Sequence, residues 1–157
     1  MQRFLKLASK LTLSEWWLLF IAYWRLLYVE LRLRFSGVQW CMSKVCLTDD
    51  ITTGLKPTHI ESTDKLNHAR SLFEVIRLAA RMQLFSNPAC LPRSIVLADM
   101  LNARSRCESA VVKLGVGNGK AKDGLIASHA WVELGGKMVA EPAFVAEQFT
   151  RINGVLK

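Results

Sequence analysis

A long apolar and aromatic run near the N-terminus most limits how this chain can fold. The run WWLLFIAYWRLLYVELRLRF spans residues 16–35. Its uninterrupted part, residues 16–24, would extend about 14 Å as a helix, roughly half of the ~30 Å hydrocarbon core of a bilayer. Arg25 and Glu30 then interrupt the run. The run therefore predicts a helix that needs another apolar surface to cover it but does not cross a membrane.

The start of this helix is predicted from a capping box. Thr12 precedes Glu15 by three residues, the spacing at which each side chain satisfies a backbone N–H group of the other residue. Three interpretations of the helix remain open: it packs on the rest of the domain, docks another protein, or lies on a membrane surface. Its many Trp, Tyr and Phe residues suit a protein interface.

The charge pattern narrows the class of partner. The 157 residues carry a formal charge of +8, which favours an acidic partner. The basic residues are scattered, and neither a phosphate loop nor a helix-turn-helix signature is present. We therefore expect no nucleic acid among the partners, while a weak association with a membrane surface stays open.

The four cysteines indicate reduced thiols. Cys41, Cys46, Cys90 and Cys107 form no CxxC pair, and no second histidine stands near them, so no metal site is expected. The N-terminus shows no secretory signal. We expect a cytoplasmic location, with structural or incidental roles for Cys41 and Cys46.

Turn-forming residues divide the chain. Residues 36–61 contain Gly, Pro, Asp and Thr in the pattern of a connection. We place an N-terminal helical segment at residues 1–50 and the main domain at residues 60–157. A second helix is predicted from Ser62 onward, because apolar residues recur at i, i+3 and i+4 up to Ala80.

Cys90 is the candidate nucleophile. It stands two residues before Pro92, and proline is favoured in the first turn of a helix. The residues that follow, up to Leu101, are apolar enough for a central helix. Backbone N–H groups and the positive end of the helix dipole at such a start favour a thiolate and could receive an oxyanion. A lone cysteine is otherwise a small buried hydrophobe.

His129 is the candidate base. ASHAWVEL, residues 127–134, predicts a strand with His129, Trp131 and Glu133 on one face. A solvent-facing strand side would explain the histidine alone, but a thiol and an imidazole in one domain favour a nucleophile-base pair. Before this strand we predict another over residues 109–116. A flexible loop over residues 115–124 is expected to admit or clamp substrate.

The third member of the site is an acid. Glu133 shares the face of His129 but lies about 13 Å farther along the strand, which is too far. Glu141 could return on the other strand of a hairpin, although a regular Gly135-Gly136 turn would leave it on the face opposite His129. We therefore predict an irregular hairpin at residues 135–137, or a bulge near Ala140.

The motifs CLPRSIVLADML, KLGVG and HAWVELGGKMVAEP, taken in this order, resemble one family. The stretch of residues 62–142 is similar to the transglutaminase-like cysteine proteases that remove leader peptides in lasso-peptide biosynthesis. The resemblance implies an α+β fold with a papain-like, transglutaminase-like core, in which a Cys-bearing central helix packs on a small antiparallel sheet. The α-helical N-terminal segment is also in keeping with this family.

The resemblance also implies roles for three residues. Cys90 matches the family's nucleophile and His129 its general base. Glu141 falls where the family carries an acid, often an aspartate, so this chain has a side chain one methylene longer. The family cleaves a ribosomal precursor peptide through acyl transfer to water, and no cofactor is implied in the peptidase itself.

The same resemblance implies partners. These are the leader region of the precursor, a separate leader-recognition protein, and a lasso cyclase that uses ATP to close the ring. The aromatic helix of residues 16–35 is a candidate docking surface for the recognition protein or the leader. Two alternatives stay open: a transglutaminase-type acyl transferase, and a non-catalytic peptide-binding module.

Overall fold

The computed structural model describes residues 12–45, 63–83, 89–103, 110–120, 126–134, 136–139 and 148–151. In this part of the chain the helices precede the strands, and the architecture is α+β as expected. The helices are α2 (Leu13–Val45), α3 (Thr63–Met82) and α4 (Cys90–Asn102). The strands are β1 (Ala110–Lys120), β2 (Ile126–Leu134), β3 (Lys137–Val139) and β4 (Phe149–Arg151).

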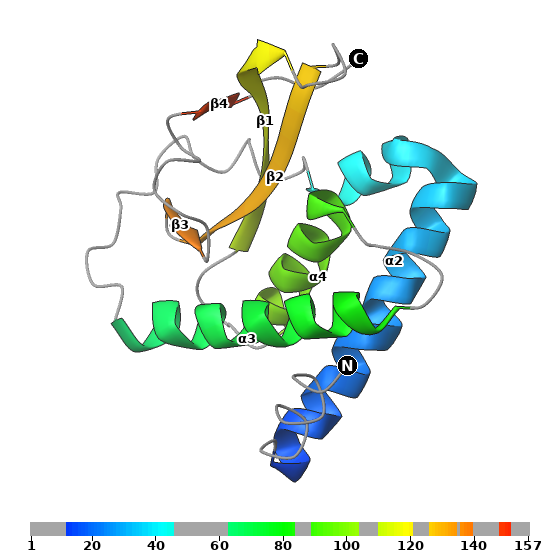
Figure 1. Ribbon diagram of the computed structural model, residues 1–157, viewed down its shortest axis with the longest axis vertical. Helices are drawn as coiled ribbons and strands as arrows, with labels where there is room; N and C mark the ends of the chain where they lie inside the picture. Colours follow the sequence, from blue (N-terminus) through cyan, green and yellow to red (C-terminus); the bar gives the residue numbers. More distant parts are fainter. Residues whose placement is uncertain are drawn as a thin grey trace.

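Helix α4 lies at the centre of the fold. It contacts α2, α3, β1 and β2, and Figure 1 shows it between the sheet and α2. The strands form one antiparallel sheet in the order β3-β2-β1-β4. Val112, Val132 and Val139 lie side by side on β1, β2 and β3 and point into the core shared with the helices. The prediction of a Cys-bearing central helix packed on a small antiparallel sheet is confirmed.

The hydrophobic core draws on all three helices. Residues with the i, i+3, i+4 spacing of α3 bury one face of that helix, as the sequence predicts. Helix α2 contributes a face of its own, so the interpretation in which it packs on the domain is confirmed for that face. The buried positions of the two helices are Leu19, Ala22, Leu26, Val29, Ala69, Leu72, Ile76, Ala79 and Ala80.

The N-terminus of α2 has the predicted capping box. The backbone N–H of Thr12 donates to Oε2 of Glu15 at 2.7 Å, and the N–H of Glu15 donates to the Thr12 hydroxyl at 3.4 Å. Arg25, which interrupts the apolar run, forms an ion pair with Asp99 of α4. Because both side chains are partly exposed, this pair links α2 to α4 but contributes little free energy.

We expect this cap to weaken in acid. Hydrogen bonds from the backbone N–H and the hydroxyl of Thr12 lower the pKa of Glu15 below its usual 4.5. A depressed folded-state pKa means that the stabilisation is complete above the unfolded pKa and is lost as the pH falls through the folded pKa. The melting temperatures of the wild type and Glu15→Gln should therefore differ at neutral pH and converge in acid. A difference that persists below the Glu15 pKa would contradict a charge-based cap.

The predictions of a connection at residues 36–61 and of a loop at residues 115–124 are partly wrong. Helix α2 continues past residue 36 to Val45, with a single break at Gly37, whose φ of 69° suits glycine. Strand β1 continues to Lys120, so residues 115–120 are not a loop. Pairing with β2 and with β4 gives this glycine-rich stretch an extended conformation that its composition does not favour.

None of the helices in the described ranges is long and apolar enough to cross a membrane. This finding agrees with the interruption of the apolar run by Arg25 and Glu30.

Candidate active site

Cys90 is the first residue of α4, as the sequence predicts, and its side chain is half-buried. Ala89 before it is extended, and Pro92 falls in the first turn. No side chain at the cap position bonds to the N–H groups of this turn. Because helix starts leave N–H groups without intrahelical partners, this end of α4 can stabilise negative charge beside the thiol.

A buried hydrogen bond fixes the Cys90 end of α4 to β2. Ser94 lies one turn after Cys90 on the same side of the helix, and its hydroxyl donates to the carbonyl oxygen of Ala130 at 2.9 Å. Ala130 directly follows His129 on β2, and the described pairs between β2 and β3 cover residues 132–134. The bond therefore ties α4, one turn after Cys90, to the residue that follows His129 on β2.

His129 lies between aromatic rings from two strands. Trp131 stacks along it with ring centroids 6.3 Å apart, and Phe149 of β4 lies 5.2 Å from it. The Nε2 atom of His129 is buried. Gly115, directly opposite on β1, has no side chain and leaves the space that the Trp131 ring occupies. The imidazole is thus restrained by two aromatic rings, with its Nε2 atom buried.

The two faces of β2 are those predicted from its alternation. Val132 and Leu134 point into the core with α4, whereas His129, Trp131 and Glu133 share the opposite face. His129 thus lies on the face of β2 turned away from α4, the helix that begins with Cys90.

Glu133 has a structural partner. It is buried, and its Oε1 accepts a hydrogen bond from the indole N–H of Trp131 at 2.9 Å. This bond fixes the ring that stacks on His129. We expected no catalytic role for Glu133. Its hydrogen bond with Trp131 instead gives this carboxylate a structural role.

The hairpin that leads toward Glu141 has a regular start. Leu134 pairs with Lys137 and Val132 with Val139, so the irregular hairpin predicted at residues 135–137 is wrong. Gly135 and Gly136 permit a tight two-residue turn. This is the regular turn that leaves Glu141 on the face opposite His129 unless a bulge follows. Glu141 and a bulge at Ala140 lie outside the described residues. If the register continued without a bulge, Glu141 would stand opposite Ala130, on the face away from His129.

Comparison with known proteins decides the family. A profile of the transglutaminase-like superfamily matches residues 26–154. The chain belongs to the transglutaminase-like superfamily. Its members are generally cysteine peptidases or acyltransferases. The match begins within α2, runs through β4, and includes Cys90, His129 and Glu141. Searches of curated proteins and of solved structures find no match.

Gln83 of this transglutaminase-like chain links two helices. Gln83 directly follows α3, and its side-chain amide donates a hydrogen bond to the backbone carbonyl oxygen of Tyr23 on α2 at 3.3 Å. Within the described ranges, no three His, Cys, Asp or Glu residues are grouped so that they could hold a metal ion. Cys46 and Cys107 lie outside those ranges.

Sequence reasoning did not identify two residues of this transglutaminase-like site. Ser94 carried a signal, since it is a hydroxyl within an apolar helix and lies one turn from Cys90. Phe149 carried almost none, because β4 is only three residues long and reaches His129 solely through sheet pairing.

We expect Ser94→Ala to reduce both stability and reactivity. The change leaves the Ala130 carbonyl without the hydroxyl and should lower the free energy of unfolding by about 1–2 kcal/mol. A small shift of the Cys90 turn should slow any reaction at the thiol, by roughly 10- to 100-fold. Chemical denaturation and the rate of iodoacetamide labelling at Cys90 measure the two effects. Ser94→Thr, which keeps the hydroxyl, is the control. Unchanged values in Ser94→Ala would contradict the positioning role.

Proposed function

We propose that this transglutaminase-like protein is a cysteine peptidase that removes the leader from a ribosomally made lasso-peptide precursor. The observation that carries the peptidase proposal is the Ser94–Ala130 hydrogen bond, which joins the helix that Cys90 begins to the strand that carries His129. Cysteine proteases belong to this superfamily, and thiol, imidazole and helix N–H groups are the parts that acyl transfer needs.

In this mechanism His129 takes the proton of the Cys90 thiol, and the sulfur attacks the scissile carbonyl of the leader. Backbone N–H groups at the start of α4 stabilise the oxyanion; Pro92 supplies none. Protonated His129 then gives its proton to the leaving amine of the core peptide. Water, deprotonated by His129, hydrolyses the thioester and restores the thiol.

The aromatic setting of His129 supports this role. Trp131 and Phe149 restrict the imidazole ring, and electrostatic interactions at its buried Nε2 atom are stronger than they would be in water. Glu141 is proposed as the residue that orients the imidazole. Because the hairpin is regular through Val139, this role requires a bulge at Ala140.

The lasso-peptide substrate rests on motif resemblance. CLPRS around Cys90 and HAWVE around His129 occur in the order and separation of the leader peptidases. The proposed partners are the precursor leader, a separate recognition protein and an ATP-using cyclase. The chemistry in this chain uses its own side chains and water, so we propose no cofactor.

Isotope labelling tests the reaction. The protein is incubated with a precursor peptide and its recognition protein in H₂¹⁸O, and the products are weighed by mass spectrometry. A peptidase releases a leader fragment whose new C-terminal carboxylate carries one ¹⁸O from thioester hydrolysis. Joining of the leader acyl group to an added amine, without ¹⁸O, would instead indicate an acyl transferase. Intact precursor together with tight peptide binding would indicate a binding module.

A further inference from the structure

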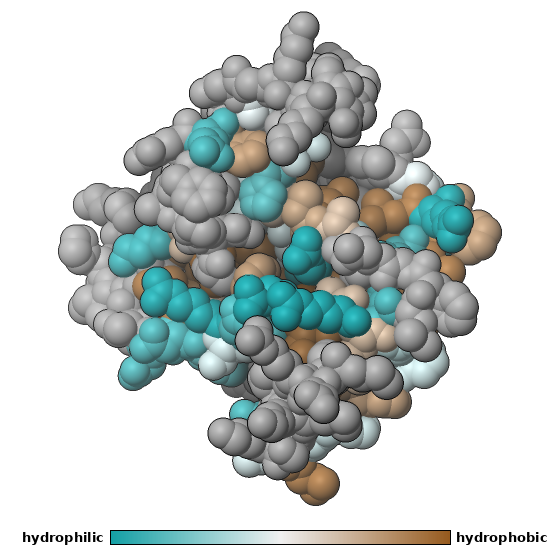
Figure 2. Space-filling model, viewed as in Figure 1, coloured by the Kyte–Doolittle hydropathy of each residue, from teal (hydrophilic) through white to brown (hydrophobic). Residues whose placement is uncertain are grey.

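The side of α2 that faces away from the core carries a continuous apolar stripe. Its members are 45–90 % exposed, and they lie opposite the buried positions of the same helix. Figure 2 shows separate hydrophobic patches at the surface on the side of the molecule where α2 lies. We call the following residues the α2 stripe: Leu13, Trp17, Phe20, Trp24, Tyr28, Leu31 and Phe35.

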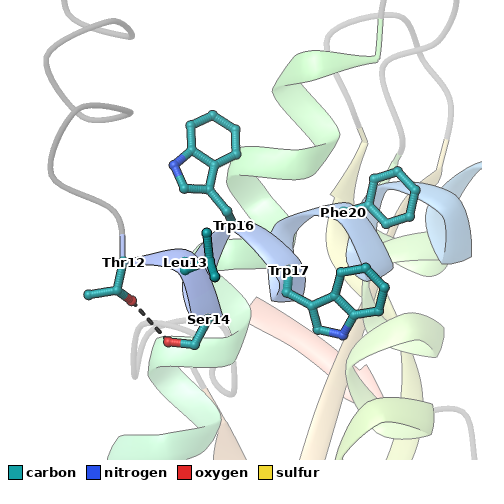
Figure 3. Close-up of a pocket in the computed structure, with 6 residues that line it drawn as sticks. All are labelled: Thr12, Leu13, Ser14, Trp16, Trp17 and Phe20. Atoms are coloured by element: carbon teal, nitrogen blue, oxygen red, sulfur yellow. Dashed lines mark hydrogen bonds between the residues drawn. The ribbon is translucent and has the colours of Figure 1, made fainter.

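The α2 stripe occupies the whole straight part of the helix. It begins at Leu13, the first helical residue, and ends at Phe35, two residues before the break at Gly37. At helical rise this is a length of about 33 Å. Near its start an open groove is lined by Leu13, Trp16, Trp17 and Phe20, whose side chains project from α2 in Figure 3. An exposed apolar surface of this size indicates an interaction site.

The spacing of the stripe is symmetric about Trp24. Successive members are four, three, four, four, three and four residues apart, a series that reads the same in both directions. A twofold axis through Trp24 would therefore bring Phe20 opposite Tyr28 of an antiparallel copy. A surface that complements itself in this way is what a twofold, isologous interface requires.

We infer that the α2 stripe binds a second copy of this chain, with the two α2 helices antiparallel and Trp24 facing its own copy. In this pairing Leu13 faces Phe35, and Leu31 faces Trp17, so each leucine meets an aromatic ring. Trp16 and Arg34 flank the same side of the stripe, and they come together as a cation–π pair across the interface.

The area of the stripe suits a stable dimer. Aromatic side chains bury about 150–250 Å² each, so members that are at least about half exposed present on the order of 800 Å² per chain. A standard protein interface buries roughly 800 Å² from each partner. The stripe alone thus provides the apolar centre of an interface of ordinary size.

The charges beside the stripe favour a second copy over an anionic membrane. Residues 12–37 contain three arginines and two glutamates, a net charge of +1 (3 − 2). Arg25 is paired with Asp99, and the Arg32 guanidinium lies 5.5 Å from the Tyr28 ring centroid. Helices that bind anionic membranes carry many basic residues on a free polar face, whereas the opposite face of α2 is buried in the core. The local charge is also too small to repel a copy strongly.

Sedimentation of the full-length protein tests the dimer. We expect twice the chain mass of 17.7 kDa at micromolar concentration. Trp24→Lys sets two ammonium groups against each other at the axis, so the dimer dissociation constant should rise on the order of 100-fold. Asn67→Lys, which adds the same charge on the exposed side of α3, should leave the dimer intact. Circular dichroism is used to check that each variant folds.

Photocrosslinking tests the antiparallel arrangement in the otherwise unchanged chain. With Leu13 replaced by p-benzoylphenylalanine, the crosslink should join position 13 to the partner near Phe35. A crosslink between the two copies of position 13 would indicate a parallel pair and overturn the inference. A wild-type monomer would also overturn it, as would a dimer that survives Trp24→Lys. So would a monomer that uses Trp24 to bind anionic vesicles or the recognition protein. None of these outcomes depends on Cys90 chemistry.

Discussion

Cys90→Ala should abolish cleavage of the leader peptide, with a rate at least on the order of 10³-fold below that of the wild type. The variant removes the sulfur that would form the thioester, and no other group at the start of α4 can replace it. Cys90 is half-buried, so the loss of one sulfur atom should leave the fold intact. Mass spectrometry of the precursor after incubation measures the rate, and binding of the leader measures whether the surface persists.

Two kinds of variant accompany Cys90→Ala: deletions of thiols outside the site, and loss of the proposed base. Cys41→Ala and Cys46→Ala delete thiols for which we expect structural or incidental roles, and both should retain full cleavage. His129→Gln should lose cleavage to a similar extent as Cys90→Ala, because nucleophile and base act as one unit and their losses are not additive. Cleavage by Cys90→Ala at the wild-type rate would end the peptidase proposal, even if the dimer inferred from the α2 stripe were found.

Gly115→Val should destabilise the fold by about 3 kcal/mol and displace the candidate base. A Cβ at this position would lie 2.7 Å from Cη2 and Cζ3 of Trp131 and 3.0 Å from Cβ of Phe149. Trp131 is the largest fully buried side chain in the described residues, so its ring has little room to move. Since both aromatic residues contact His129, labelling or cleavage at Cys90 should slow along with the loss of stability.

A double-mutant cycle identifies the clash behind the Gly115 effect. Trp131→Phe removes the ring atoms that a side chain at position 115 would strike. Gly115→Val should therefore cost much less in the Trp131→Phe background than in the wild type, as measured by urea denaturation. Equal costs in both backgrounds would show that the contact with Trp131 does not require glycine.

Local features of the chain were predictable wherever one segment contains all the interacting groups. The Thr12–Glu15 capping box, the start of α4 at Cys90 and the two faces of β2 were each predicted and are confirmed. Caps depend on residues three apart, and strand faces depend on alternation, so neither needs knowledge of distant partners. Cys90 and His129 were likewise identified from the sequence as the candidate nucleophile and base.

Predictions that depended on pairing were less successful. Residues 115–120 have the composition of a loop, yet β2 and β4 hydrogen-bond with β1 along this stretch. The hairpin at Gly135-Gly136 was expected to be irregular because Glu141 was assumed to need that geometry. Backbone register is set by the turn and by the neighbouring strands, and it does not adjust to a proposed role for one carboxylate.

The sequence by itself determined that Cys90 begins a central helix and that His129 lies on a strand, on the same face as Trp131 and Glu133. Only the tertiary structure decided that the Ser94 hydroxyl bonds to the Ala130 carbonyl, that Phe149 lies against His129, and that Gly115 leaves room for Trp131. The physical reason is range: helix starts and strand faces follow from neighbours within a few residues. Contacts between α4, β1, β2 and β4 exist only after the chain has packed, and no local pattern encodes their register.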